Sequence, residues 1–128
     1  MLSSSSIRYL LAIYELSDGG AAVRSVDVSR VLGVSRASVV KGLKKLAAQE
    51  LIRKEYYGNI QLTPLGVRES NRIFTEYTLL HAYFSNCAGF SPENARADAI
   101  SAICAFSAEG KEALMQRALR DASDGASP

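Results

Sequence analysis

The fold is decided by residues 25–46, which read SVDVSRVLGVSRASVVKGLKKL. A short helix is predicted to end at Gly33, since glycine readily adopts the left-handed backbone that often follows a helix. Its apolar side chains fall on one side: Val28, Val31 and Leu32. Ser35 offers a hydroxyl as the N-cap of a second helix. Two helices joined by so short a turn predict a helix-turn-helix motif, whose second helix enters the major groove of DNA.

The second helix has one apolar stripe and one polar face. Val39, Leu43 and Leu46 recur at i, i+4 and i+7, which is the pattern of a buried face. Gly42 lies near this stripe, which favours close packing against another helix. Lysines on the outer face of a single helix are often merely solvated. Here they coincide with the turn, the cap and a following hairpin, so we interpret them as DNA contacts.

A β-hairpin, the wing, is predicted in residues 51–62, with a turn at residues 57–59 and alternating apolar residues in its second strand. Arg53 and Lys54 place positive charge where a wing would lie along the DNA backbone. The predicted partner is therefore double-stranded DNA. The residues predicted to contact it are Ser25, Ser35, Arg36, Ala37, Ser38, Val40, Lys41, Lys44, Lys45, Arg53, Lys54 and Tyr57.

The charge of the chain is unevenly distributed. The 128 residues carry a net charge of +2, but residues 1–72 hold 11 Lys/Arg and 6 Asp/Glu, whereas residues 73–128 hold 4 and 7. Phosphate neutralisation needs local positive charge, so the first part is predicted to bind nucleic acid. The chain start lacks the order of a signal peptide and no long apolar run follows, which predicts a cytoplasmic protein without a membrane segment. Cys87 and Cys104 are expected to be reduced thiols.

The remaining chain is predicted to be helical. An amphipathic helix covers residues 7–17, and Thr63 followed by proline starts a long helix that runs to about Asn86. Ser91 and Ser107 cap two further helices. The predicted fold is mainly α, with a winged helix-turn-helix DNA-binding domain in residues 1–72. An all-α dimerisation domain in residues 73–120 and a disordered tail in residues 121–128 complete the prediction.

These segments resemble the DtxR/MntR family of metal-dependent bacterial repressors. The matching stretches are residues 9–10, 13–16, 23–29, 32–39, 43–46 and 57–66. The resemblance implies a homodimer that binds a palindromic operator and uses divalent manganese or iron as its cofactor. Glu50 departs from the family, which usually has glycine at the end of the recognition helix.

The main departure concerns the metal site. A divalent ion binds carboxylate, imidazole or thiolate groups. By the resemblance, extended without gaps, the family's ligand positions fall on Arg8, Leu11, Thr78, Ile100, Ile103 and Cys104. The chain is therefore predicted to regulate transcription without a required metal. Packed apolar side chains would hold the arrangement permanently, or an open pocket would accept a small organic effector.

Two alternatives to a metal-independent regulator stay open. A relocated metal site could use His81, Cys104 and nearby carboxylates, although a single histidine is more often a structural residue. A winged helix could also dock an acidic protein instead of DNA. An enzyme is not predicted, because a pairing of Cys104 with His81 has no third group or motif behind it.

Overall fold

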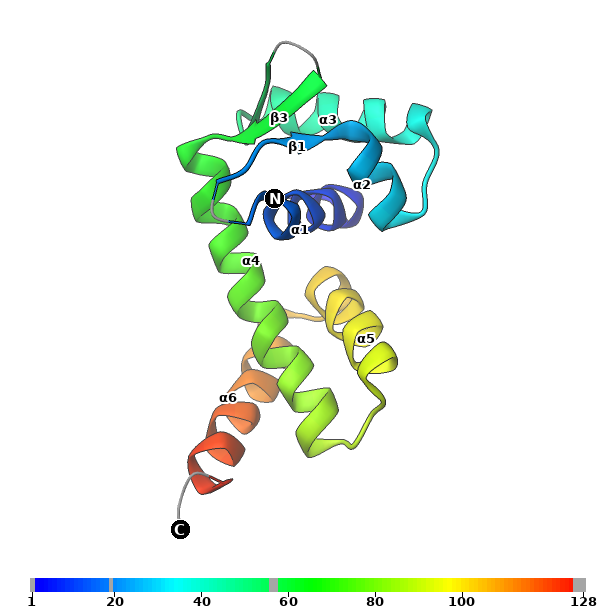
Figure 1. Ribbon diagram of the computed structural model, residues 1–128. Helices are drawn as coiled ribbons and strands as arrows, with labels where there is room; N and C mark the ends of the chain where they lie inside the picture. Colours follow the sequence, from blue (N-terminus) through cyan, green and yellow to red (C-terminus); the bar gives the residue numbers. More distant parts are fainter. Residues whose placement is uncertain (1, 19, 56–57, 126–128) are drawn as a thin grey trace. The chain divides into compact units, whose positions relative to one another are not determined.

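The computed structural model describes residues 2–18, 20–55 and 58–125 (Figure 1). These residues form a mainly helical protein with one small antiparallel sheet, and the chain divides into two compact units, residues 1–72 and 73–128. The predicted fold class is confirmed. The elements are α1 (Ser4–Ser17), β1 (Val23–Arg24), α2 (Ser25–Leu32), α3 (Arg36–Ala48), β2 (Ile52–Lys54), β3 (Asn59–Leu62), α4 (Pro64–Ala82), the π-helical turn η2 (Tyr83–Cys87), α5 (Pro92–Ala105) and α6 (Ala108–Gly125).

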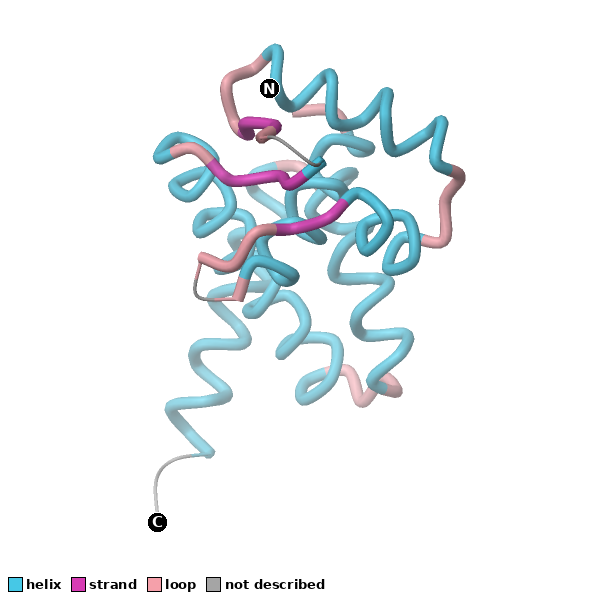
Figure 2. Tube along the Cα trace, turned by 45° about the horizontal axis from the view of Figure 1, so that its top comes forward, coloured by secondary structure: helices cyan, strands magenta, loops and turns pink. Residues whose placement is uncertain are grey.

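The sheet of residues 1–72 contains three antiparallel strands in the order β1-β3-β2, drawn in magenta in Figure 2. Ile60 of β3 pairs with Val23 of β1, and Leu62 pairs with Ile52 of β2. Strands β2 and β3 are the two predicted strands of the wing. Strand β1 was not predicted, because two residues are too few to show an alternating pattern.

Helix α1 supplies much of the core of residues 1–72. It contacts α2, α3, β1 and β3, and its residues Leu10 and Ile13 are fully buried. The helix starts at Ser4, earlier than the predicted start at Ile7, because the Ser3 hydroxyl accepts a hydrogen bond from the backbone N–H of Ser6 at 3.1 Å. Its buried side chains hold the two helices of the helix-turn-helix and the wing in one unit.

A tight corner joins α3 to the wing at Glu50. The backbone of Glu50 has φ 61°, and Glu50 is the one non-glycine residue in the left-handed region in the described part of the chain. The Thr63 hydroxyl donates to the Glu50 carbonyl oxygen at 2.6 Å and accepts from the N–H of Gly66 at 3.0 Å. The corner is therefore fixed to the start of α4. It imposes a left-handed conformation that costs a residue with a Cβ about 1–2 kcal/mol.

Replacing Glu50 with glycine is expected to raise the free energy of unfolding by about 1 kcal/mol, since relief of strain exceeds the extra entropy of glycine in the unfolded chain. Gln49→Gly is the matched control: Gln49 has φ −89°, so glycine there brings only the entropic cost. Urea denaturation of both variants measures the difference. A Glu50→Gly protein less stable than wild type would contradict the strain argument.

Residues 73–128 pack through small side chains and a few polar contacts. Ala95, Ala99 and Ala102 of α5 are fully buried, which lets neighbouring helices approach closely. The Lys111 ammonium of α6 lies 3.2 Å from the Glu76 carboxylate of α4, and both side chains are largely shielded from solvent. This shielded ion pair ties α6 to the second half of α4.

The tail prediction was wrong for residues 121–125, because α6 extends through Gly125. Asp121 makes contacts that a disordered tail would lack: its carboxylate lies 3.4 Å from Arg117 Nε and accepts a hydrogen bond from Cys87 Sγ at 2.8 Å. Residues 126–128 lie outside the described residues. No helix in the described ranges is both long and apolar enough to span a membrane.

Candidate DNA-binding surface

The turn between α2 and α3 is fixed by local hydrogen bonds. Gly33 has φ 65°, as predicted for the residue that ends α2. The Ser29 hydroxyl donates to the Val34 carbonyl oxygen at 2.6 Å. The Ser35 hydroxyl accepts from the N–H of Ser38 at 3.1 Å, which confirms the predicted N-cap of α3. These contacts set the angle between the two helices.

Helix α3 is oriented by its buried stripe. Val39, Leu43 and Leu46 are almost completely buried, as predicted. Gly42 is buried beside them, and a Cβ built at this position would lie 2.8 Å from ring carbons of Tyr9 on α1. The close packing predicted for Gly42 is thus a contact with the Tyr9 ring. It leaves the opposite face of α3 free for a partner.

The opposite face of α3 is exposed and basic. None of its four cationic side chains makes an ion pair or a hydrogen bond within residues 2–18, 20–55 and 58–125. The exposed residues are Arg36, Ala37, Ser38, Val40, Lys41, Lys44 and Lys45. Cations without a protein partner are available to neutralise phosphates or to donate to base edges.

The other predicted contacts lie at the wing and at the start of α2. Arg53 and Lys54 are exposed on β2, and Ser25 is a half-buried first residue of α2. Tyr57 lies outside the described residues. Arg24 is a further candidate that the sequence reading missed. It is exposed on β1 and pairs in register with Asn59 of the wing, and without β1 nothing in the sequence indicated its place beside the wing.

The residues at the family's metal positions do not suit a divalent cation. Leu11 and Ile103 are buried hydrocarbons, and Arg8 is an exposed cation. The Thr78 hydroxyl donates to the Phe74 carbonyl oxygen at 2.9 Å. The two remaining positions, Ile100 and Cys104, are half-buried, so this set offers a single thiol as a soft ligand.

A relocated metal site also lacks a clustered donor set in the described part of the chain, where no three His, Cys, Asp or Glu residues gather closely enough to hold an ion. His81 Nδ1 lies 3.4 Å from the Ser85 hydroxyl. The hydrogen bond to Asp121 raises the pKa of the Cys87 thiol above its usual range, and burial and the carboxylate charge raise it further. A thiol held protonated is a poor metal ligand, because ligation needs the thiolate.

Comparison with known proteins agrees with this arrangement. Residues 1–60 match the family described as "Iron dependent repressor, N-terminal DNA binding domain". The chain is 33% identical over 86 residues to the HTH-type transcriptional regulator MntR of Geobacillus kaustophilus, a match that covers 67% of this chain and 60% of that protein. In its DNA-binding part, the chain is similar to the DtxR/MntR family.

Other DtxR/MntR relatives extend the likeness. MntR of Listeria monocytogenes is 31% identical over 77 residues, or 60% of this chain and 54% of the relative. The chain thus spans little more than half of such relatives. The crystal structure of T. acidophilum IdeR superposes with a TM-score of 0.76 and 27% identity, covering 91% of this chain and 53% of that chain. The manganese regulator SloR has the same fold, with a TM-score of 0.75 at 22% identity, covering 91% of this chain and 54% of that chain.

Proposed function

We propose that this protein is a sequence-specific transcriptional repressor that binds double-stranded DNA through α3. The observation that carries the proposal is the exposed basic face of α3, held by a capped turn and backed by the buried contact between Tyr9 and Gly42. The family match over residues 1–60 supports the same role. The wing cations Arg53 and Lys54 would contact the DNA backbone.

The proposed functional form is a homodimer on a palindromic operator. Three large apolar side chains stay exposed in the described part of this second unit, residues 73–124: Phe90, Phe106 and Leu119, at 40%, 46% and 47%. Exposed aromatic and aliphatic side chains of this size favour association with another protein surface. A twofold dimer would cover them and set two recognition helices about one DNA turn, ~34 Å, apart.

We further propose that DNA binding does not require a metal. The residues at the family positions give a divalent ion one thiol, a hydroxyl that already donates to Phe74, and an opposing charge at Arg8. Leu11 and Ile103, at two of these positions, are buried hydrocarbons that offer an ion no donor atom. A DNA-binding conformation that needs no ion would be competent at all metal concentrations.

The function is tested by selecting operators from a random duplex library with the purified protein and sequencing the bound DNA. The proposal expects one enriched site with inverted symmetry, affinity that falls steeply with salt, and a dimer in sedimentation. Binding of an acidic protein that duplex DNA does not displace would support the interaction-module alternative. A site without inverted symmetry, or a monomer on DNA, would contradict the dimer.

Metal removal is expected to leave operator affinity unchanged within about twofold. The reason is that the residues at the family's ligand positions do not together form a suitable donor set. DNA-binding titrations with chelator, and with micromolar manganese, iron(II) or zinc, measure this. Elemental analysis of the purified protein accompanies them. A loss of about tenfold or more on chelation, restored by one metal, would show a working site elsewhere in the chain.

A further inference from the structure

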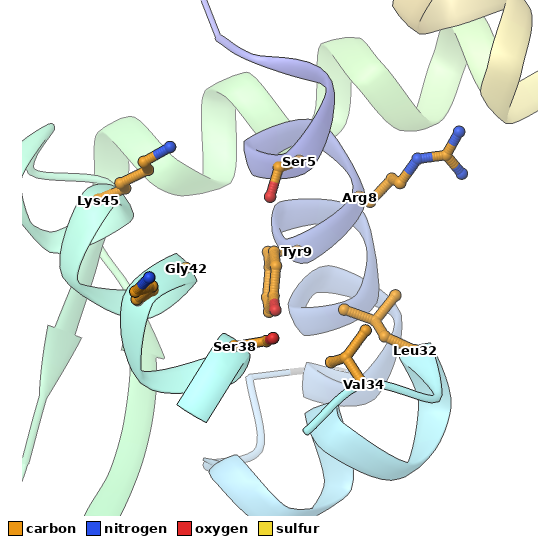
Figure 3. Close-up of a pocket in the computed structure, with 9 residues that line it drawn as sticks. Ser5, Arg8, Tyr9, Leu32, Val34, Ser38, Gly42 and Lys45 are labelled. Atoms are coloured by element: carbon orange, nitrogen blue, oxygen red, sulfur yellow. The ribbon is translucent and has the colours of Figure 1, made fainter. Parts of the chain in front are cut away.

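An open groove of about 520 Å³ lies between α1, the end of α2 and α3 (Figure 3). All of its lining residues belong to residues 1–72. The volume falls within the roughly 300–1,000 Å³ typical of small-molecule sites. The predicted DNA contacts account for part of its rim, but not for its floor.

The floor of the groove is apolar. Tyr9 lies between α1 and α3, opposite Gly42 and Ser38, and Leu32 and Val34 lie together at one side (Figure 3). The Tyr9 side chain is only 6% exposed and is held against Gly42. A DNA phosphate binds through cations at a surface, and contact with an aromatic ring would not stabilise it. A ligand with an apolar body would cover these side chains.

The rim of the groove is cationic. Arg8, Lys41 and Lys45 line it, no carboxylate does, and none of the three is paired with an acid in the described residues. Arg8 and Lys45 lie on opposite sides of Tyr9 (Figure 3). The guanidinium of Arg8 is directed away from the ring there, and this exposed side chain is free to turn over a bound anion. Hydroxyls of Ser5 and Ser38 add hydrogen-bonding groups.

We propose that the groove binds a small organic anion that joins an aromatic or aliphatic body to a carboxylate or phosphate. The body would lie over Tyr9, and the anionic group would pair with the cations of the rim. Ser38, Lys41 and Lys45 also belong to the proposed DNA-binding face, so the bound anion would compete with DNA. The competition rests on the proposed function, whereas binding of the anion does not.

Phenyl phosphate is the probe, titrated into the full chain without DNA and followed by backbone amide NMR. Saturable shifts are expected at Val34 and Gly42, with inorganic phosphate and phenol each binding at least about tenfold more weakly, because each lacks half of the interaction. The double variant Arg8→Gln/Lys45→Gln should bind phenyl phosphate at least about tenfold more weakly. Arg68→Gln, which removes an exposed arginine outside the groove, should bind it like wild type.

Absence of saturable shifts at the groove would overturn the proposal. Equal binding of phenyl phosphate and inorganic phosphate would also overturn it, and would indicate a position for a DNA backbone phosphate instead. An equal loss of phenyl phosphate affinity in Arg68→Gln would show that net charge, and not the groove, causes the effect, and would also overturn the proposal. In a second arm, saturating phenyl phosphate should weaken binding of the selected operator by at least about fivefold. Unchanged affinity with a filled groove would overturn the competition, and failure to bind any duplex would refute the proposed function while leaving the groove titration valid.

Discussion

Replacing Lys41 with alanine is expected to weaken binding to the selected operator by about 5- to 150-fold, equivalent to about 1–3 kcal/mol, if the ammonium reads a guanine. Lys41 lies on the exposed face of α3, within two turns of the capped N-terminus of the helix. It has no ion-pair partner in the described residues. Preference for one base pair should relax at the same time.

Two further variants separate base reading from charge. Arg53→Ala on the wing should weaken all sequences to a similar degree and reduce the slope of affinity against salt by about one unit. Arg120→Ala removes an exposed cation from α6 and should bind the operator like wild type. Fluorescence anisotropy over a salt series measures all three variants. Equal operator affinity of wild type and Lys41→Ala would refute the assignment of α3 as the reading helix.

Local signals in the sequence predicted the elements that position this surface. Gly33 and Ser35 each fix one end of a helix through their own backbone or side chain, so their roles can be read without knowledge of the tertiary structure. The same holds for Thr63, whose hydroxyl accepts from the first turn of α4. The buried stripe of α3 was predictable because helical periodicity is a property of the element alone.

Features that depend on distant segments were not predictable from such signals. Strand β1 exists because Val23 pairs with Ile60, far along the chain. Asp121 is held in a helix partly by Cys87, which lies 34 residues earlier. Val31 follows the predicted apolar side of α2 but is 49% exposed, since periodicity does not show which neighbours cover a short helix. The groove above Tyr9 needs three elements together, so the sequence identified Arg8 only as a replaced metal position.

The first turn of α4 lies so close to the corner after α3 that Gly66 has no room for a side chain. A Cβ at Gly66 would overlap the carbonyl oxygen of Leu51, and that oxygen accepts the N–H of Thr63 at 3.1 Å. Because Leu51 also donates its N–H to Leu46 at 3.0 Å, its peptide cannot shift without disturbing the end of α3. The absence of a side chain at Gly66 therefore allows α3, the wing and α4 to pack together at this junction.

Gly66→Ala is expected to lower the free energy of unfolding by about 3 kcal/mol or more, since overpacking against backbone cannot be relieved by a side-chain rotation. Gly110→Ala is the matched control. Gly110 also donates its N–H to a capping hydroxyl, that of Ser107 at 3.0 Å, but the nearest atom to its Cβ is that movable hydroxyl at 3.3 Å. Its better helix propensity should keep this variant within about 1 kcal/mol of wild type. Urea denaturation followed by circular dichroism compares the two, and equal stabilities would show that the Leu51 carbonyl can move aside at little cost.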